Sequence, residues 1–575
     1  MASRRGVVIV FALLAVAVMF SISGLVLLSM LTPPVPTVQT NSTLELPLQA
    51  PFQEIDRIDL FSPLVDRPLT LRHTVDLLRR ARTDDRITSV VVRPRTAGAL
   101  WGQLQEVRAA LLDFRTSGKP VTAYLEYGGA GEYYLASAAD RVLMMPAGQL
   151  DLTGVATYEI FLRGTMDKLG VFPDLLHIGE YKTASNTFTE KTFTPAHREM
   201  TRDLTRSWFD ELVRAIAESR KLSDADVRTI IDQGPFLAAE AQEAGLVDAL
   251  AYEDQIADGS PVPARRTIKA SQYSRSRATG GRGPRIALLY AAGTIASGRS
   301  SYDMPGAQVI GSDTFAEWVR RARNDSDIRA IVVRVDSPGG SAIASEVIWR
   351  ELMLARDVKP VVVSMGDVAA SGGYYIAAPA HAIVAQPGTI TGSIGVVTGK
   401  YVLQGSMDKL GVGTGSESLG RFAEMYSPFR PFTRAERDRV DEQMQATYDL
   451  FVTRVADGRQ STREKIDAVA QGRVWTGRQA SELGLVDELG GLDRAIAIAR
   501  ERARIDADGD VTLVVYPPRR SFYEIMANPL DMTAVARLSI LFDRPEVRAL
   551  ETITSVFGRF RSGEPLAIMP NVLLR

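Results

Sequence analysis

Hydrophobic residues in this chain gather in short runs separated by amphipathic stretches, and this pattern predicts alternating strands and helices. In the second half, residues 285–290, 328–335 and 360–365 are mostly apolar runs with the length of buried strands. Residues 342–355 have the length and periodicity of a helix. Alternation of this kind favours α/β layers with largely parallel strands. We therefore expect an α/β fold.

One apolar run near the N-terminus is far longer than these strands. Residues 7–31 span 25 positions without a charged side chain, enough at about 1.5 Å per residue to cross a hydrocarbon core of about 30 Å. Arg4 and Arg5 precede the run, and no Lys or Arg follows it until Arg57. The positive-inside rule then predicts a cytoplasmic N-terminus, with the rest of the chain on the other side of the membrane.

A cleaved signal peptide is the alternative interpretation of this run. The apolar region of a signal peptide is usually about 7–15 residues long and ends at a small-x-small cleavage site. The run at 7–31 is longer, and residues 28–31 (LSML) make a poor cleavage site. We therefore expect an uncleaved transmembrane anchor, followed by a stiff proline-rich stalk.

The remainder of the chain contains one unit twice. GTMDKLGV at 164–171 recurs as GSMDKLGV at 405–412, an offset of 405 − 164 = 241 residues. ITSVVVR at 87–93 recurs as IRAIVVR at 328–334 with the same offset. A period this long indicates duplication of a whole domain, because solenoid repeats are about 20–50 residues long.

This repeat and the composition divide the chain into seven segments. We predict a cytoplasmic N-terminus (1–6), a transmembrane anchor (7–31), a stalk (32–43), an N-terminal domain (44–257), a linker (258–284), a C-terminal domain (285–515) and a tail (516–575). In the tail, an apolar stripe over 547–557 indicates a helix that packs against another surface.

Charge and cysteine content exclude several classes of function. Lys and Arg number 67 and Asp and Glu 68, giving a net charge of −1 with no basic region of the kind that binds nucleic acid. The chain has no cysteine, which excludes a disulfide framework, a thiolate nucleophile and zinc-ribbon spacing. At 575 residues and 45% hydrophobic content it can bury more than one core.

Each copy of the repeat keeps one reactive side chain that the other copy has lost. Ser371 corresponds to Ala130 at the offset of 241, and Lys182 corresponds to Ala423. This complementary loss indicates that one active site is built from both copies.

Ser371 precedes a predicted helix over 372–378 and follows an apolar strand. A serine there can simply cap the helix. It can also act as a nucleophile, because the helix N-terminus and the amide of Gly372 favour a developing oxyanion. The turn DSPGG at 336–340 could aim a second amide, that of Gly340, at the same place, and in the first copy this glycine has become Ala99.

Lys182 is the candidate base for this serine. The chain has four histidines, and none forms an evident Ser-His-Asp order with Ser371. A lysine accepts a proton only if burial lowers its pKa. Lys182 lies among small and apolar residues in IGEYKTAS at 178–185. A solvated surface charge is the alternative interpretation.

These motifs resemble the signal peptide peptidase A (protease IV) family in its long, duplicated bacterial form. The resemblance covers nearly the whole chain and rests on DSPGG at 336–340, ASGGYY at 370–375, TGSIG at 391–395 and GEYK at 179–182. It implies that Ser371 is the nucleophile, Lys182 the general base and Ser393 the residue that orients the lysine. For Ser393 a plain turn serine between glycines is the alternative. A Clp-type triad would place a histidine about 25 residues after the serine, where Val396 stands.

The resemblance also implies the fold, the assembly and the substrates. Each half is expected to be a crotonase/Clp-protease-like domain, and the chain to form a homotetramer on the periplasmic side of the bacterial inner membrane. Its substrates would be remnant signal peptides and other apolar segments, cleaved without metal, nucleotide or other cofactor. The competing hypotheses are an acyl-CoA enzyme of the crotonase type and a non-catalytic membrane scaffold.

Overall fold

The computed structural model describes residues 19, 36–55, 69–96, 98–256, 266–276, 283–302, 308–506, 510–518, 560, 562–570 and 573–574. Apart from residue 19, the predicted membrane anchor at 7–31 lies outside the described residues, and so does the predicted tail helix at 547–557. Among the helices that are described, none is both long enough and apolar enough to cross a membrane.

The first copy of the repeat is built around a parallel sheet. The central strands run in the order β4-β3-β2-β1 and pair in parallel throughout. Their bounds are β1 (Ser42–Gln49), β2 (Ile87–Arg95), β3 (Val121–Gly129) and β4 (Arg141–Asp151). Their inward side chains are fully buried because helices cover the sheet, as expected for parallel strands.

The second copy repeats this arrangement. Its strands run in the order β18-β16-β14-β10, again parallel. Their bounds are β10 (Arg285–Ala292), β14 (Ile328–Ser337), β16 (Val361–Ala370) and β18 (Ile390–Gly392). The helix predicted at 342–355 is α12 (Ala342–Arg356). The α/β prediction and the elements predicted over 285–365 are therefore confirmed.

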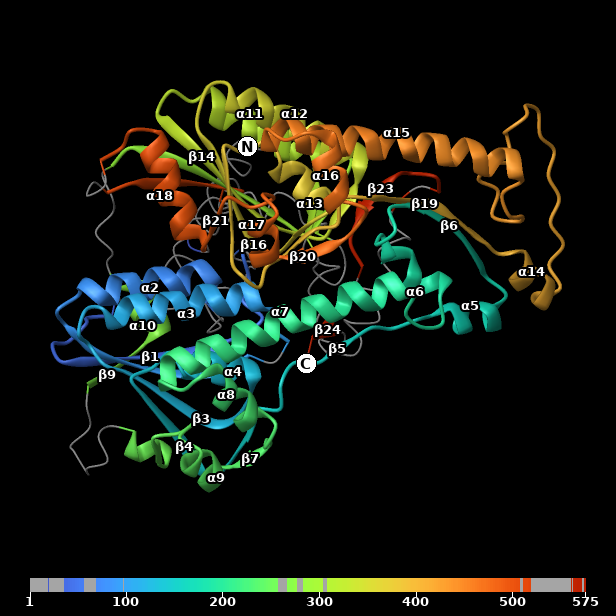
Figure 1. The fold of residues 1–575 in the computed structure, drawn as a ribbon. Coiled ribbons are helices and arrows are strands. Elements are labelled where there is room, and N and C mark those ends of the chain that lie inside the picture. Colours follow the sequence, from blue (N-terminus) through green and yellow to red (C-terminus); the bar gives the residue numbers. More distant parts are fainter. Residues whose placement is uncertain are drawn as a thin grey trace, which may run out of the picture.

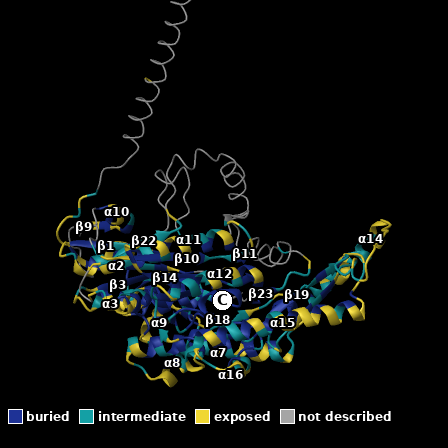
Figure 2. Cartoon of the chain, turned by 90° about the horizontal axis from the view of Figure 1, so that it is seen from above, coloured by how far each residue is buried: buried dark blue, intermediate teal, exposed yellow. Residues whose placement is uncertain are grey.

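Helices of the first copy lie between the two parallel sheets (Figure 1). Helix α3 (Trp101–Arg115) contacts β16 of the second copy. The backbone amide of Gln103 donates to Asp367 Oδ1 at 2.7 Å, and Gln105 Oε1 accepts from the amide of Gly388 at 2.7 Å. Residues on both sides of this contact are buried, so the two copies share one continuous interior (Figure 2).

A third sheet joins segments that are far apart in the sequence. Strand β6 (Phe172–Ile178) of the first copy pairs antiparallel with β19 (Val396–Val402) of the second, from Phe172 opposite Val402 to Ile178 opposite Val396. With α15 (Arg434–Arg459), α5 (Arg163–Leu169) and α14 (Gln404–Leu410) they form an arm that projects from the body (Figure 1). The repeated GxMDKLGV motif lies at the tip of this arm.

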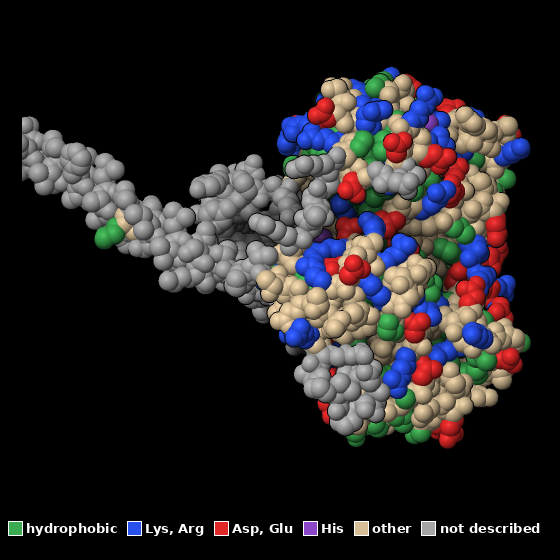
Figure 3. Space-filling view, turned by 90° about the vertical axis from the view of Figure 1, so that its left-hand side faces the viewer, with side chains coloured by type: hydrophobic (Ala, Val, Ile, Leu, Met, Phe, Trp, Pro, Cys, Tyr) green, Lys and Arg blue, Asp and Glu red, His purple; other side chains and the backbone are tan. Residues whose placement is uncertain are grey.

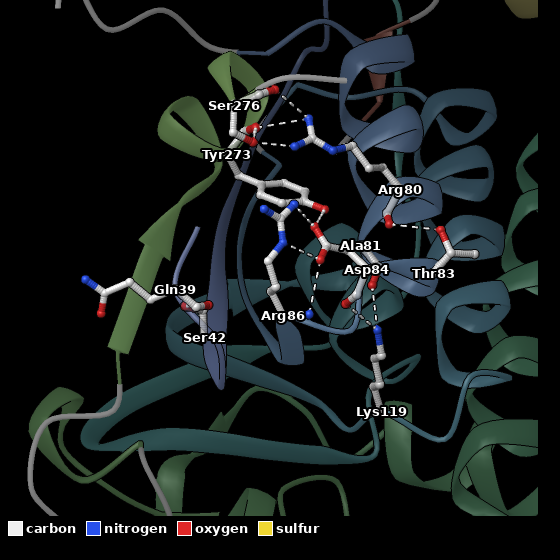
Figure 4. A network of polar contacts seen from close by, with 10 residues as sticks. All are labelled: Gln39, Ser42, Arg80, Ala81, Thr83, Asp84, Arg86, Lys119, Tyr273 and Ser276. Atoms are coloured by element: carbon white, nitrogen blue, oxygen red, sulfur yellow. Dashed lines mark hydrogen bonds and ion pairs between the residues drawn. The ribbon is translucent and has the colours of Figure 1, made fainter. Parts of the chain in front are cut away.

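The range 258–284, which the sequence assigns to a linker, contributes to the first sheet. Strand β9 (Arg266–Lys269) pairs in parallel with β1, and α10 (Ala270–Arg275) follows it. Arg80 donates to the carbonyl oxygens of Tyr273 and Ser276 at 3.2 and 3.1 Å, and the Tyr273 hydroxyl donates to Asp84 at 2.9 Å (Figure 4). These contacts fasten the end of the first copy to α2 (Leu71–Thr83).

On the face shown in Figure 3, basic and acidic side chains are interspersed rather than separated by sign. This distribution agrees with the balanced composition of the chain. It offers no basic stripe of the kind that follows a nucleic-acid backbone on this face.

Candidate active site

Ser371 lies at the junction between β16 and the short helix α13 (Gly372–Ala377). Its backbone has φ 53° and ψ −113°, a left-handed conformation that costs a non-glycine residue about 1–3 kcal/mol. The Ser371 amide donates to the carbonyl of Gly392 at 2.7 Å, which helps to hold this conformation. Its side chain makes no capping hydrogen bond to the helix, so the helix-cap interpretation is wrong.

Lys182 reaches the site from the first copy through the end of β6. The chain turns at Gly179, which has φ 106°, and the amide of Tyr181 then donates to the carbonyl of Gln471 at 2.8 Å. Gly472 touches the backbone of Lys182 so closely that a Cβ at position 472 would lie 2.5 Å from the Lys182 Cα. The loop at 471–472 of the second copy therefore fixes where the lysine side chain starts.

The structure brings Lys182, Ser371 and Ser393 together. The Lys182 Nζ lies 2.7 Å from Ser371 Oγ, 2.8 Å from the Ser393 carbonyl oxygen and 3.0 Å from Ser393 Oγ. A neutral amine has two N–H donors and one lone pair. The donors suit the two oxygens of Ser393, which leaves the lone pair to accept the proton of the Ser371 hydroxyl.

The electrostatics of the site favour this neutral amine. Lys182 is fully buried, so the interpretation of it as a solvated surface charge is wrong. Burial lowers the pKa of Lys182 well below its ordinary value of 10.5, because the charged form loses its hydration. The three hydrogen-bond partners of the amine carry no charge that would restore the ammonium form.

The two glycines predicted to supply oxyanion donors lie next to this group. Gly340 belongs to β15 (Gly339–Ser341) and Gly372 opens α13. A Cβ added at Gly339 would lie 2.6 Å from the Gly372 backbone nitrogen. The β15 strand and the start of α13 are thus in contact beside Ser371, and an added side chain on this strand would obstruct the Gly372 amide.

The counterparts of these side chains do not form a second group of this kind. Ala130 is the first residue of α4 (Ala130–Ala136) in the first copy, and Ala423 is exposed in the loop after α14. Neither alanine can transfer a proton. Within the described ranges, no cluster of three His, Cys, Asp or Glu residues could hold a metal ion.

Two features of the site were missed in the sequence. Gly472 is one of many glycines, and its contact with Lys182 joins residues 290 positions apart (472 − 182 = 290). Strand β23 (Leu566–Ile568), in the tail, pairs with β15 beside the oxyanion glycines. Its short apolar run between Pro565 and Pro570 is a strand signal that could have been found.

A family model described as Peptidase family S49 matches residues 113–260 and 354–506. The two matches begin 354 − 113 = 241 residues apart, the same offset as the internal repeat. The duplication predicted from the sequence is therefore confirmed.

Curated relatives agree with this match. Serine protease SPPA, chloroplastic, of Arabidopsis thaliana is 35% identical over 76% of this chain and 66% of its own length. Protease 4 of Salmonella typhi is 38% identical over 75% of this chain and 72% of its own length. A protein of Enterococcus faecium named as a candidate signal peptide peptidase SppA is 32% identical over 35% of this chain and 58% of its own length.

The contact at Gly472 yields a prediction with a matched control. Gly472→Ala should slow the reaction of Ser371 with a fluorophosphonate probe about 100-fold, because it displaces Lys182. Gly484 has nearly the same φ, 73° against 75°, but a Cβ there would meet nothing within 4 Å. Both variants should lose about 1–2 kcal/mol of unfolding free energy from the left-handed backbone. Equal probe rates in Gly472→Ala and Gly484→Ala would contradict the positioning role.

Proposed function

We propose, from the premise that the chain belongs to peptidase family S49 and is a serine peptidase, that it works through a Ser371–Lys182 dyad. The observation that carries the proposal is the 2.7 Å distance between a buried lysine amine and a serine hydroxyl. Ser393 holds the amine through its carbonyl and hydroxyl oxygens. Among the described residues, no histidine forms a hydrogen bond with the amine.

Acylation begins when neutral Lys182 takes the proton from the Ser371 hydroxyl. The serine oxygen attacks the peptide carbonyl carbon, and the carbonyl oxygen becomes an oxyanion. The amides of Gly340 and Gly372 donate to it, and one such donor contributes about 2.7–4 kcal/mol to transition-state stabilisation. As the C–N bond breaks, the Lys182 ammonium protonates the leaving amine.

Deacylation uses the same two side chains. Lys182, neutral again, takes a proton from a water molecule that attacks the acyl carbon. The second tetrahedral intermediate collapses, Ser371 leaves and regains its proton from Lys182, and the peptide acid is released. Burial lowers the pKa of the amine and so favours its neutral form. This supports both steps, because the base must be unprotonated at the start of each.

The proposed substrates are remnant signal peptides and other apolar segments in an extended conformation. The name of the Enterococcus faecium relative supports this class of substrate. Each half is proposed to adopt a crotonase/Clp-protease-like fold, which the duplicated parallel sheets support. The two halves are proposed to span residues 44–257 and 285–515, joined by residues 258–284.

We further propose that residues 7–31 anchor the chain in the bacterial inner membrane as part of a homotetramer with its body outside the cytoplasm. The uncharged run supports the anchor. Apolar side chains exposed on the arm, among them Leu169, Phe172 and Leu410, support a contact between subunits. Deleting residues 1–31 should move the chain from the membrane to the soluble fraction without changing its oligomeric mass in sedimentation. A chain that remains in the membrane would refute the anchor, and a monomer would refute the tetramer.

Substitution of the dyad tests the catalytic assignment. Ser371→Ala should reduce cleavage of an apolar peptide to background, and Lys182→Met should reduce it at least about 10²–10⁴-fold. Lys168→Met, which changes an exposed lysine on α5, should leave the rate unchanged. A Lys182→Met chain with normal turnover would place the base elsewhere.

Protein stability provides the control for this series. The pKa of Lys182 is lower in the folded chain than in the unfolded chain. At a pH below 10.5 the unfolded chain therefore binds this proton more tightly, which favours unfolding. The lysine therefore reduces stability at neutral pH. The Lys182→Met variant should thus unfold at a temperature no lower than the unaltered chain, and its loss of activity cannot be ascribed to unfolding.

The pH dependence of kcat/KM tests the protonation state directly. Only the neutral amine accepts the serine proton, so kcat/KM should rise tenfold per pH unit while Lys182 deprotonates and then become constant. Because burial lowers the pKa of Lys182, this plateau should begin well below pH 10.5. A rate that still rises tenfold per unit above pH 9 would contradict the proposal.

A further inference from the structure

The C-terminal tail lies in the third sheet beside the candidate active site. Strand β23 pairs antiparallel with β15 on one side and with β19 on the other. Figure 1 shows it next to β19, although the two are more than 160 residues apart in the chain (566 − 402 = 164). A segment from the tail thus lies between β15, which contains Gly340, and β19, which belongs to the arm.

The register places one peptide group of the tail at the oxyanion position. Ala567 lies opposite Gly340. The Ala342 amide donates to Pro565 O at 3.1 Å, and the Met569 amide donates to Pro338 O at 3.0 Å. Because hydrogen-bonded pairs alternate along antiparallel strands, Gly340 and Ala567 form the pair between these two. The Gly340 amide therefore faces the Ala567 carbonyl oxygen.

Gly372 approaches the same oxygen. A Cβ added at Gly372 would lie 3.1 Å from the Ala567 carbonyl oxygen, and one added at Gly339 would lie 2.0 Å from it. The oxygen is thus in contact with both elements that supply the proposed oxyanion donors. In a peptide substrate this is the place of the carbonyl that the serine attacks.

The rest of the segment is held as an extended strand. Thr398 Oγ1 donates to Glu564 O at 2.9 Å, and the Gly563 amide donates to Gly399 O at 3.1 Å. Leu566 and Ile568 are buried together with Ala184, which follows Lys182 by two residues, and Val397, which belongs to β19. Ala567 is fully buried in the core of the second copy.

We propose that residues 563–570 are a built-in inhibitor that occupies the place of the substrate strand. This inference rests on the proposed function, because it takes Ser371 as the nucleophile and the amides of Gly340 and Gly372 as the oxyanion donors. The tail must leave the groove between β15 and β19 before an apolar peptide can pair there. The sequence of this segment also indicates which substrate would fit. It would be an extended apolar peptide with a small residue, in the place of Ala567, at the carbonyl that Ser371 attacks.

The geometry explains how the tail can resist cleavage. Attack on Ala567 would form the acyl-enzyme and release the amine of Ile568. That amine would remain at the site, because Met569 is hydrogen-bonded to Pro338 and β24 (Leu573–Leu574) pairs with β5 (Thr157–Tyr158). The retained amine can attack the acyl carbon again and restore the peptide bond, with the proton returning through Lys182.

Variants of the full-length chain test the proposal. Met569→Pro removes the amide that donates to Pro338, and Ala567→Asp places an unpaired carboxylate in the core, so both should release the tail. Each should raise kcat/KM for an apolar peptide at least tenfold, and the fluorophosphonate labelling rate of Ser371 by a similar factor. Ser562→Ala, at the exposed turn before the strand, should change neither rate.

A synthetic peptide provides a second measurement. The peptide GEPLAIMP, which has the sequence of residues 563–570, should inhibit the Met569→Pro chain competitively. The same peptide with Trp in place of the alanine should not, because the alanine site is fully buried. Failure of the first peptide to inhibit would overturn the proposal.

The outcomes separate this inference from the proposed function. If Ser371 fails to react with the probe in every chain, the serine peptidase assignment through Ser371 fails, and the inhibitor proposal fails with it. If all chains react and turn over peptide at the same rate with unchanged thermal unfolding, only the inhibitor is refuted. An intact mass that shows the unaltered chain cut after Ala567 would also refute it, because the tail would then be a substrate.

Discussion

The desolvation of the Lys182 amine is the physical constraint on which the rest of the structure depends. The amine is fully buried, and its partners are the oxygens of Ser371 and Ser393. Burying a lysine without a carboxylate partner is costly, and the cost falls if the amine gives up its proton. The two copies of the repeat must therefore keep bulk water away from the side chain, because full hydration of the amine would restore the ammonium form.

That enclosure requires a firm contact between the copies. Arg334 of β14 is buried, with its guanidinium 2.8 Å from Glu54 and 2.9 Å from Glu106 of the first copy. Removing one partner of a buried ion pair costs about 3–5 kcal/mol, so these charges resist separation of the copies. Trp208 of α7 (Pro195–Arg220) adds a hydrogen bond to Gly388 O at 3.0 Å. These contacts hold together the two copies that supply the lysine and the serine.

The third sheet connects the active site with the arm and the tail. β6 delivers the lysine, β19 follows Ser393, and β15 carries Gly340, so these three residues belong to or adjoin one sheet, while Ser371 comes from the end of β16. Inserting β23 between β15 and β19 completes this sheet with the chain's own residues. If β23 left this sheet, the free edge of β15 would bind another extended segment through main-chain hydrogen bonds, and the buried alanine site would select a small side chain. A substrate can therefore reach Ser371 only when the tail has left its position between β15 and β19.

The sequence alone determined the duplication and the α/β layers, and it singled out Ser371 and Lys182 as the candidate pair. Apolar periodicity sets strands and helices locally, and the offset of 241 residues exposed the complementary loss at Ala130 and Ala423. Only the tertiary structure decided that β6 pairs across the copies, that Gly472 touches Lys182 and that the tail strand lies against Gly340. Such pairings join residues up to hundreds of positions apart, and they depend on complementary surfaces and backbone partners that no local pattern specifies. Burial of the amine, which lowers its pKa, is a property of those packed surfaces and not of residue 182 by itself.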